Sequence, residues 1–106
     1  MASTFEDNTR LKLAEVADLI ISKQKDYGSG NILNSPIDPK LAVLVRLNDK
    51  LARAGNLLQK GRTASNESLE DTAKDIIGYG FILMALLDDT FDLPLEEEIK
   101  EYKDGV

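Results

Sequence analysis

The sequence predicts an all-α protein, a small antiparallel helical bundle of three main helices and a short C-terminal helix. Three long segments repeat apolar residues every three or four positions, which is the spacing of an amphipathic helix. No segment alternates apolar and polar residues as a β-strand does. Glycine, proline and asparagine gather between the first two apolar segments, where they favour turns. With 106 residues, 42% hydrophobic and 30% charged, the chain has the size and composition of one folded domain.

The first helix is expected from about Thr4 to Lys25. Ser3 and Glu6 have the spacing of a capping box at its start, and Gly28 favours its end nearby. Its apolar stripe consists of Leu13, Val16, Ala17, Ile20 and Ile21. Residues 28–39 are rich in glycine, proline and asparagine and are predicted to form a loop. A loop of this length in a small domain indicates either a functional segment or a plain connector.

The second helix is expected to begin at Asp38, with Pro39 in its first turn, and to end at Gly61. Its predicted buried stripe consists of Leu41, Leu44, Leu47, Leu51, Ala54 and Leu58.

The third helix is expected to begin at Ser65 or Asn66 and to reach Leu87. Its apolar residues are Leu69, Ala73, Ile76, Ile77, Phe81, Leu83, Met84 and Leu87. Because they cover more than one side, we expect this helix to lie centrally or to face a second subunit, and the protein to form a homo-oligomer. A short fourth helix is expected from Asp92 to about Lys103.

The chain contains neither cysteine nor histidine. This excludes disulfides, thiol nucleophiles, zinc–thiolate sites and any histidine base or metal ligand. A metal would have to be a hard cation bound by oxygen, such as magnesium or manganese. No apolar run approaches the ~20 residues that span a bilayer, and no signal peptide is visible. We therefore expect a cytoplasmic protein without a membrane partner.

The charge is distributed unevenly. Residues 1–87 carry 11 acidic and 11 basic side chains, whereas residues 88–106 carry 8 acidic and 2 basic ones and account for the net charge of −6. The chain is thus predicted to consist of a neutral helical core, residues 1–87, and an acidic C-terminal helix or tail, residues 88–106. Long duplex nucleic acid is a poor partner for this surface, but a local basic pocket could still bind a small phosphorylated ligand.

Two rows of charged residues lie opposite the apolar stripes. Arg46, Asp49, Lys50 and Arg53 share one side of the second helix. Glu67, Asp71 and Asp75 follow one another at four-residue steps on the third helix, with Tyr79 one step further. One interpretation is a ladder of salt bridges or a solvated face, which is common on helices. The other is a phosphate site, in which the basic row holds phosphates and the carboxylates hold magnesium and direct water at a phosphoanhydride.

The end of the first helix is a second point of interest. Lys23, Lys25 and Tyr27 precede the flexible stretch Gly28–Asn31. Tyr27 could stack on a base while the lysines contact phosphate. The alternative is an ordinary helix C-terminus, with the tyrosine packed on the core.

These segments together resemble the nucleotide modification associated domain 1 family, which occurs in many bacteriophages. The resemblance rests on KQKDYGSGNIL (residues 23–33), LVRLNDKLARAGNLL (residues 44–58) and NESLEDTAKDIIGYGFIL (residues 66–83), within a match over about residues 9–87. The family's pattern falls on Lys23, Asp26, Tyr27 and Gly28, then on Arg46, Asp49, Lys50 and Arg53, then on Glu67, Ser68, Asp71, Thr72, Asp75 and Tyr79. The resemblance implies a role in phage nucleotide metabolism or nucleotide modification.

The chain is also loosely similar to all-α nucleoside triphosphate pyrophosphohydrolases of the MazG and dUTPase type. Those enzymes hold magnesium with Glu-x-x-Glu on one helix and Glu-x-x-Asp on the next. Here Glu15 and Asp18 are the nearest counterpart of the first motif, and Glu67 to Asp71 overlaps the second only in part.

Three hypotheses follow. The first is a phage enzyme that processes a nucleotide, with Glu67, Asp71 and Asp75 as catalytic and magnesium-binding residues. The second is a protein that binds a nucleotide without catalysis, either to sequester it, for example a host defence signal, or to assist a modifying enzyme. The third is a purely structural helical oligomer. In the first two, the ligand-binding residues are Lys23, Tyr27, Gly28, Arg46, Asp49, Lys50, Arg53 and Tyr79. Both require the second and third helices to face a common hollow.

Overall fold

The computed structural model describes residues 4–60 and 65–99, and the side chains of residues 65–68 lie outside that description. It contains helices and no strands over these ranges, which confirms the predicted all-α class but not the arrangement as an antiparallel bundle. The helices are α1 (Phe5–Tyr27), α2 (Gly30–Leu33), α3 (Pro39–Lys60) and α4 (Ser65–Leu87), and residues 96–99 form a last helical turn. None of the helices in the described ranges is long and apolar enough to cross a membrane.

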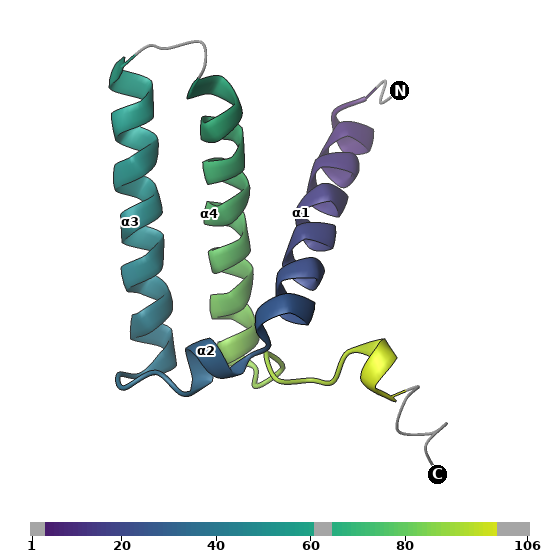
Figure 1. The fold of residues 1–106 in the computed structure, drawn as a ribbon. Helices are drawn as coiled ribbons and strands as arrows, with labels where there is room; N and C mark the ends of the chain where they lie inside the picture. Colours follow the sequence, from purple (N-terminus) through teal and green to yellow (C-terminus); the bar gives the residue numbers. More distant parts are fainter. Residues whose placement is uncertain (1–3, 61–64, 100–106) are drawn as a thin grey trace.

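The three long helices lie in a row, with α4 between α3 and α1 (Figure 1). Helices α3 and α4 form an antiparallel hairpin, whereas α1 runs in the same direction as α4 and diverges from it toward its own N-terminus. The molecule measures 55 × 41 × 24 Å, and its radius of gyration is 16.5 Å, compared with about 13 Å for a compact domain of 100 residues. The chain therefore forms an open layer of helices, in which α4 takes the central position, one of the two arrangements expected for it.

The core lies at one end of this layer, where α2, the start of α3 and the end of α4 meet (Figure 1). Its buried residues are Ile32, Val43, Ala85, Leu86 and Phe91, with Tyr79, Ile82 and Leu83 packed against them. Val43 is fully buried. Phe91 follows α4 and folds back into the core, so part of the acidic C-terminal segment is anchored there.

Local interactions fix the ends of α1. The N-cap is Thr4, whose hydroxyl accepts a hydrogen bond from the backbone N–H of Asp7 at 3.1 Å, one residue beyond the predicted Ser3. The helix ends at Tyr27, because Gly28 takes φ 70° and ψ 177°, a conformation available almost only to glycine. The one-turn helix α2 then lies inside the predicted loop. The fourth helix was expected from Asp92, but residues 91–95 are not helical and helix begins only at residue 96.

The buried faces differ most from the prediction on α3. The residues that α3 buries are Ala42 and Val43, whereas Leu41, Leu44, Leu51 and Leu58 are exposed. On α1, Val16 is buried and Ile20 partly buried, but Leu13, Ala17 and Ile21 are exposed. The stripe predicted as buried is therefore wrong for much of α3 within the single chain, and the apolar stripe of α1 is also largely exposed. The physical reason is that a flat layer offers each outer helix only one neighbour.

Candidate functional site

A cavity of about 460 Å³ opens beside α4 near the core end of the layer. Side chains of α1 and α4 form most of its wall, and α2, α3 and the segment after α4 complete it. Its charged residues are Lys23, Arg46, Lys74 and Asp75, and its aromatic residues are Tyr27, Tyr79, Phe81 and Phe91. One cavity thus combines a cationic region with several aromatic rings.

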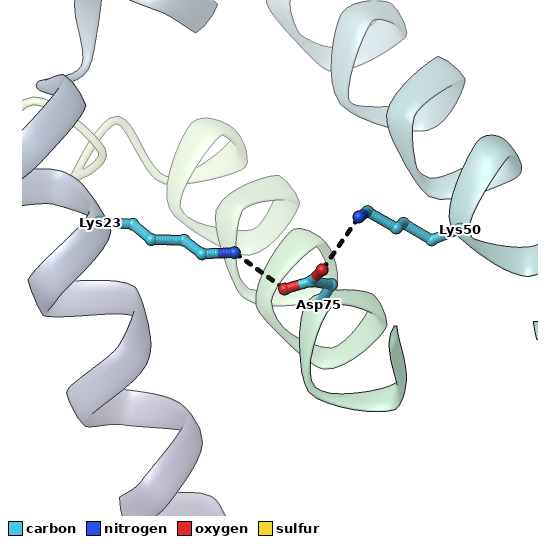
Figure 2. A network of polar contacts seen from close by, with 3 residues as sticks. All are labelled: Lys23, Lys50 and Asp75. Atoms are coloured by element: carbon cyan, nitrogen blue, oxygen red, sulfur yellow. Dashed lines mark hydrogen bonds and ion pairs between the residues drawn. The ribbon is translucent and has the colours of Figure 1, made fainter. Parts of the chain in front are cut away.

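Asp75 is the centre of a network that joins the three long helices (Figure 2). Lys23 of α1 places its Nζ 2.8 Å from Oδ1 of Asp75, and Lys50 of α3 places its Nζ 3.0 Å from Oδ2. The side chain of Asp75 is 16% exposed, while those of Lys23 and Lys50 are 49% and 31% exposed. Each carboxylate oxygen therefore has its own ammonium partner, and both lysine side chains remain partly exposed.

These contacts determine the protonation of Asp75. Burial of the carboxylate alone would raise its pKa, because removal from water disfavours the charged form. The hydrogen bonds from Lys23 and Lys50, together with their positive charges, outweigh burial and lower the pKa below its ordinary value of 3.8. Asp75 is therefore ionised at neutral pH.

Arg46 approaches the cavity from α3. Its Nη2 donates to the backbone carbonyl of Asn31 in α2 at 3.4 Å, and both residues line the cavity. Helix α2 follows directly from the turn at Gly28, so the backbone conformation of that glycine positions Asn31. The guanidinium is half-buried and retains further donors for another acceptor.

The charge of the cavity is opposite to that of the protein. Three cations and one carboxylate line it, whereas the whole chain has a net charge of −6. The cations come from three different helices, so folding brings them together. Lys74 is also 3.8 Å from Oε2 of Glu15, so part of its charge is balanced from outside the wall. The remaining excess of positive charge is suited to a small anion, because partly buried charges are screened less than exposed ones.

The structure brings most of the predicted ligand-binding residues together. Lys23, Tyr27, Gly28, Arg46 and Tyr79 line the cavity, and Lys50 contacts it through Asp75. Asp75, which was predicted as a catalytic and magnesium-binding residue, lines it as well. Asp49, Arg53 and Asp71 are exposed and do not line it. The side chain of Glu67 lies outside the described residues. The hollow was expected between the second and third helices, but the cavity lies mainly between α1 and α4. Helix α3 contributes only Arg46 to its wall, and Asp71 is not part of it.

The predicted magnesium site has no preformed geometry in the described part of the chain, where no three carboxylates lie close enough to share a cation. Both oxygens of Asp75 are bound by lysines, so a metal ion there would have to displace at least one of them. Magnesium binding by Glu67, Asp71 and Asp75 stays a prediction. The arrangement as it stands is suited to holding an anion beside two lysines and an arginine.

Sequence reasoning missed several residues of the cavity wall. Lys74 and Phe81 belong to α4, and Phe91, Leu93 and Leu95 belong to the acidic C-terminal segment. Phe91 could have been noticed as the single aromatic residue directly after α4 in an otherwise acidic stretch. No sequence signal distinguishes Leu93 and Leu95 from ordinary surface leucines.

Comparison of the chain with protein-family models, with curated proteins and with solved structures finds no match. The resemblance to the nucleotide modification associated domain 1 family therefore rests on the residues quoted above.

Proposed function

We propose that this protein binds a nucleotide in the cavity between α1 and α4. The observation that carries the proposal is the cluster of Lys23, Arg46 and Lys74, with one carboxylate and four aromatic rings, in the wall of a single cavity of an acidic protein. A nucleotide presents the matching chemistry, an anionic phosphate joined to a flat aromatic base. The cavity volume falls within the roughly 300–1,000 Å³ usual for small-molecule sites.

The cationic region would hold the phosphate. An ammonium group has three N–H donors, and Asp75 accepts one from each of Lys23 and Lys50, so the others can bind phosphate oxygens. Arg46 can add two parallel donors from its planar guanidinium. Because Asp75 already holds both lysines in place, a ligand would cost less side-chain entropy than it would at free lysines.

The aromatic side chains would hold the base. Tyr27 is 69% exposed at the end of α1, so its ring is accessible for stacking. Tyr79 lies one helical turn beyond Asp75 on α4 and packs against the core, which fixes its position. A ligand with phosphate at Asp75 and a base near these rings would use both regions of the cavity.

The family resemblance supports the same assignment independently of the charge. The three sequence blocks that carry it fall on the end of α1 with α2, on α3, and on α4. Each block contributes to the cavity: Lys23 and Tyr27 from the first, Arg46 from the second, and Asp75 and Tyr79 from the third. A motif that is scattered in sequence but gathered in space is typical of a ligand site.

Binding without catalysis is favoured over hydrolysis, because the one carboxylate in the cavity is already paired with two lysines. The protein would then sequester a nucleotide, such as a host defence signal, or present it to a modifying enzyme. Magnesium-dependent hydrolysis of a phosphoanhydride is the second candidate. It would need Asp71, which lies one turn before Asp75 on α4 but does not line the cavity in this structure. We also propose that the chain works as a homo-oligomer in the cytoplasm, which is the host cytoplasm if a phage encodes it.

Calorimetric titration with a panel of nucleotides, each with and without magnesium, tests the proposal. We expect at least one nucleotide to bind without metal, and Arg46→Gln to weaken binding at least about tenfold, because it removes a charged hydrogen-bond donor. The matched control is Arg53→Gln on the same helix, which should change affinity less than twofold since Arg53 does not line the cavity. Equal losses in both variants would contradict the assigned site, and silence across the panel would contradict nucleotide binding.

A turnover assay on the same panel separates the two candidates. Chromatography of nucleotides incubated with protein and magnesium should show them unchanged if the protein only binds them. Release of pyrophosphate or phosphate that is lost in Asp71→Asn would instead establish the hydrolase.

A further inference from the structure

Helices α3 and α4 each carry an apolar stripe with the spacing of a coiled-coil seam. On α3 it consists of Leu41, Leu44, Leu51, Gly55 and Leu58, with the polar but uncharged Asn48 at one position, and on α4 of Ala73, Ile77, Gly80, Met84 and Leu87. Within each stripe the steps alternate between three and four residues, which keeps a continuous line on one side of a helix for packing against another helix. Neither stripe contains a charged residue.

Both stripes lie in solvent in the single chain. The exposed fraction is 53% for Leu51, 66% for Leu58 and 66% for Met84. Leu41, Leu44, Ile77 and Leu87 are exposed as well. No part of the chain that the structure describes covers them.

The two stripes face the same side of the layer, opposite the cavity. On α3, the buried Val43 marks the side of the helix that packs against α4. Going around the helix from Val43, Arg46 lies in one direction, toward the cavity, and Leu44 and Leu51 lie in the other. On α4, the buried Thr72 marks the corresponding line, with Asp75 on the cavity side and Ile77 and Met84 on the other. Because the two helices are antiparallel, these arrangements mirror each other across their contact, and the stripes form one apolar face.

Two glycines on this face have no explanation within the chain. Gly55 and Gly80 have helical neighbours on both sides, where glycine costs about 1 kcal/mol relative to alanine. A Cβ built on either one would meet no described atom within 4 Å. Both residues lie within the stripes, so the missing side chains leave room for another helix to approach.

We propose that this face binds the same face of a second copy of the chain, so that two α3–α4 hairpins form a four-helix bundle. Seven of its large side chains are each about half to two-thirds exposed, which gives a patch close to the roughly 800 Å² that each partner buries in a standard specific complex. A face without charge and with matching three–four spacing on both helices is self-complementary, as a two-fold dimer requires. The dimer also supplies the packing that an open layer lacks.

The two cavities stay accessible in this dimer, because they lie on the outer sides of the bundle. The inference specifies the self-association proposed above, but it does not depend on the nucleotide site. If the dimer proposal fails, the proposed nucleotide site is unaffected, and the reverse also holds, so the two can be tested separately.

Light scattering on the full chain after size-exclusion chromatography tests the dimer. We expect a mass of two chains of 11.7 kDa for the wild type, and of one chain for Leu51→Glu and for Gly80→Val. Leu11→Glu is the matched control, because Leu11 is equally exposed but lies on α1, and it should remain dimeric. A wild-type mass of one chain would overturn all self-association, whereas dimers that persist in both stripe variants would overturn this face alone.

Single cysteines provide a second test that does not depend on a destabilising variant. The chain has no cysteine, so Leu51→Cys introduces the only thiol. We expect its alkylation by a polar reagent to be slow in concentrated protein and to accelerate several-fold on dilution. Asn56→Cys, exposed on the opposite side of α3, should react at one rate at all concentrations. Equal rates for both thiols would overturn the proposal.

Discussion

Asp75 forms ion pairs with two lysines that belong to different helices, Lys23 of α1 and Lys50 of α3. No other single residue tells more about how the site is assembled. The sequence placed it at the end of a row with Glu67 and Asp71, at steps of four residues. Each step turns by about 40° around the helix, so the row winds across the surface. Asp75 faces the cavity while Asp71 remains exposed. The spacing could predict a shared side, but which residue of the row meets the lysines depends on the placement of α1 and α3.

Asp75→Asn tests the network. The variant loses the charge that holds Lys23 and Lys50, and we expect the free energy of unfolding at pH 7 to fall by about 1 kcal/mol, a small value because both lysines are partly solvated. Urea unfolding measures the change. Asp71→Asn is the matched control and should stay within about 0.5 kcal/mol of the wild type, since Asp71 is exposed.

The pH dependence of stability shows whether the negative charge of Asp75 stabilises the folded chain. Because the pKa of Asp75 is lower in the folded chain than its ordinary value of 3.8, its stabilising effect is fully present above that value and is lost as the pH falls through the folded pKa. The difference between wild type and Asp75→Asn should therefore shrink below about pH 4. A difference that is constant from pH 7 to pH 3 would show that the charge of Asp75 contributes nothing.

At the scale of the elements, the ends of the helices could be predicted better than their faces. The expected helix over residues 65–87 coincides with α4, and the helix expected to begin at Asp38 corresponds to α3, whose first residue is Pro39. Its predicted end at Gly61 lies outside the described residues. Caps, prolines and glycines act locally, so their effects can be inferred from sequence. The buried face of α3 could not, because this helix has apolar residues on two sides. The leucine stripe is longer and more regular than the line through Val43, yet Val43 is the one that packs inside the chain.

Helix α2 was missed for a related reason. It consists of four residues within a stretch of glycine, proline and asparagine, which local preferences assign to a loop. Ile32 is buried 97% in the core, and its contacts there stabilise the turn of helix. Burial of one side chain thus decided the conformation of the segment.

Gly28→Ala tests the junction between α1 and α2. The backbone conformation at Gly28, φ 70° and ψ 177°, strains any residue with a Cβ, and we expect a loss of about 1–3 kcal/mol in the free energy of unfolding. No described atom lies within 4 Å of the added Cβ, so the loss would come from the backbone and not from a clash. Ser29→Ala is the neighbouring control: Ser29 has φ −82° and its side chain makes no capping hydrogen bond, so the change should be close to neutral. Equal stability of the two variants would contradict a strained junction.

At the scale of the whole molecule, stability is concentrated at one end of the layer. The core cluster joins α2, α3, α4 and the segment after α4, while the far ends of α1 and α3 contribute exposed leucines. Composition predicted that a core could form but not that it would lie at one end. Phe91 packs into the core at this end of the layer. It also connects the C-terminal segment to the cavity wall, because Nε2 of Gln24 in α1 donates a hydrogen bond to the backbone carbonyl of Phe91 at 3.1 Å.

Phe91→Ala is therefore expected to affect the whole molecule. Phe91 is 8% exposed among Ile32, Val43, Ala85 and Leu86, and truncating a buried phenylalanine costs about 3–5 kcal/mol. That is a large part of the ~5–15 kcal/mol that stabilises a typical domain, so we expect one cooperative unfolding transition at a much lower temperature. Circular dichroism at a single protein concentration measures it, because a dimer makes the transition depend on concentration. Leu93→Ala, two residues further and 63% exposed, should shift the transition only slightly. Similar melting temperatures of the two variants would mean that the C-terminal segment is not part of the cooperative core. The part of the cavity wall that this segment forms could then open without unfolding of the helices.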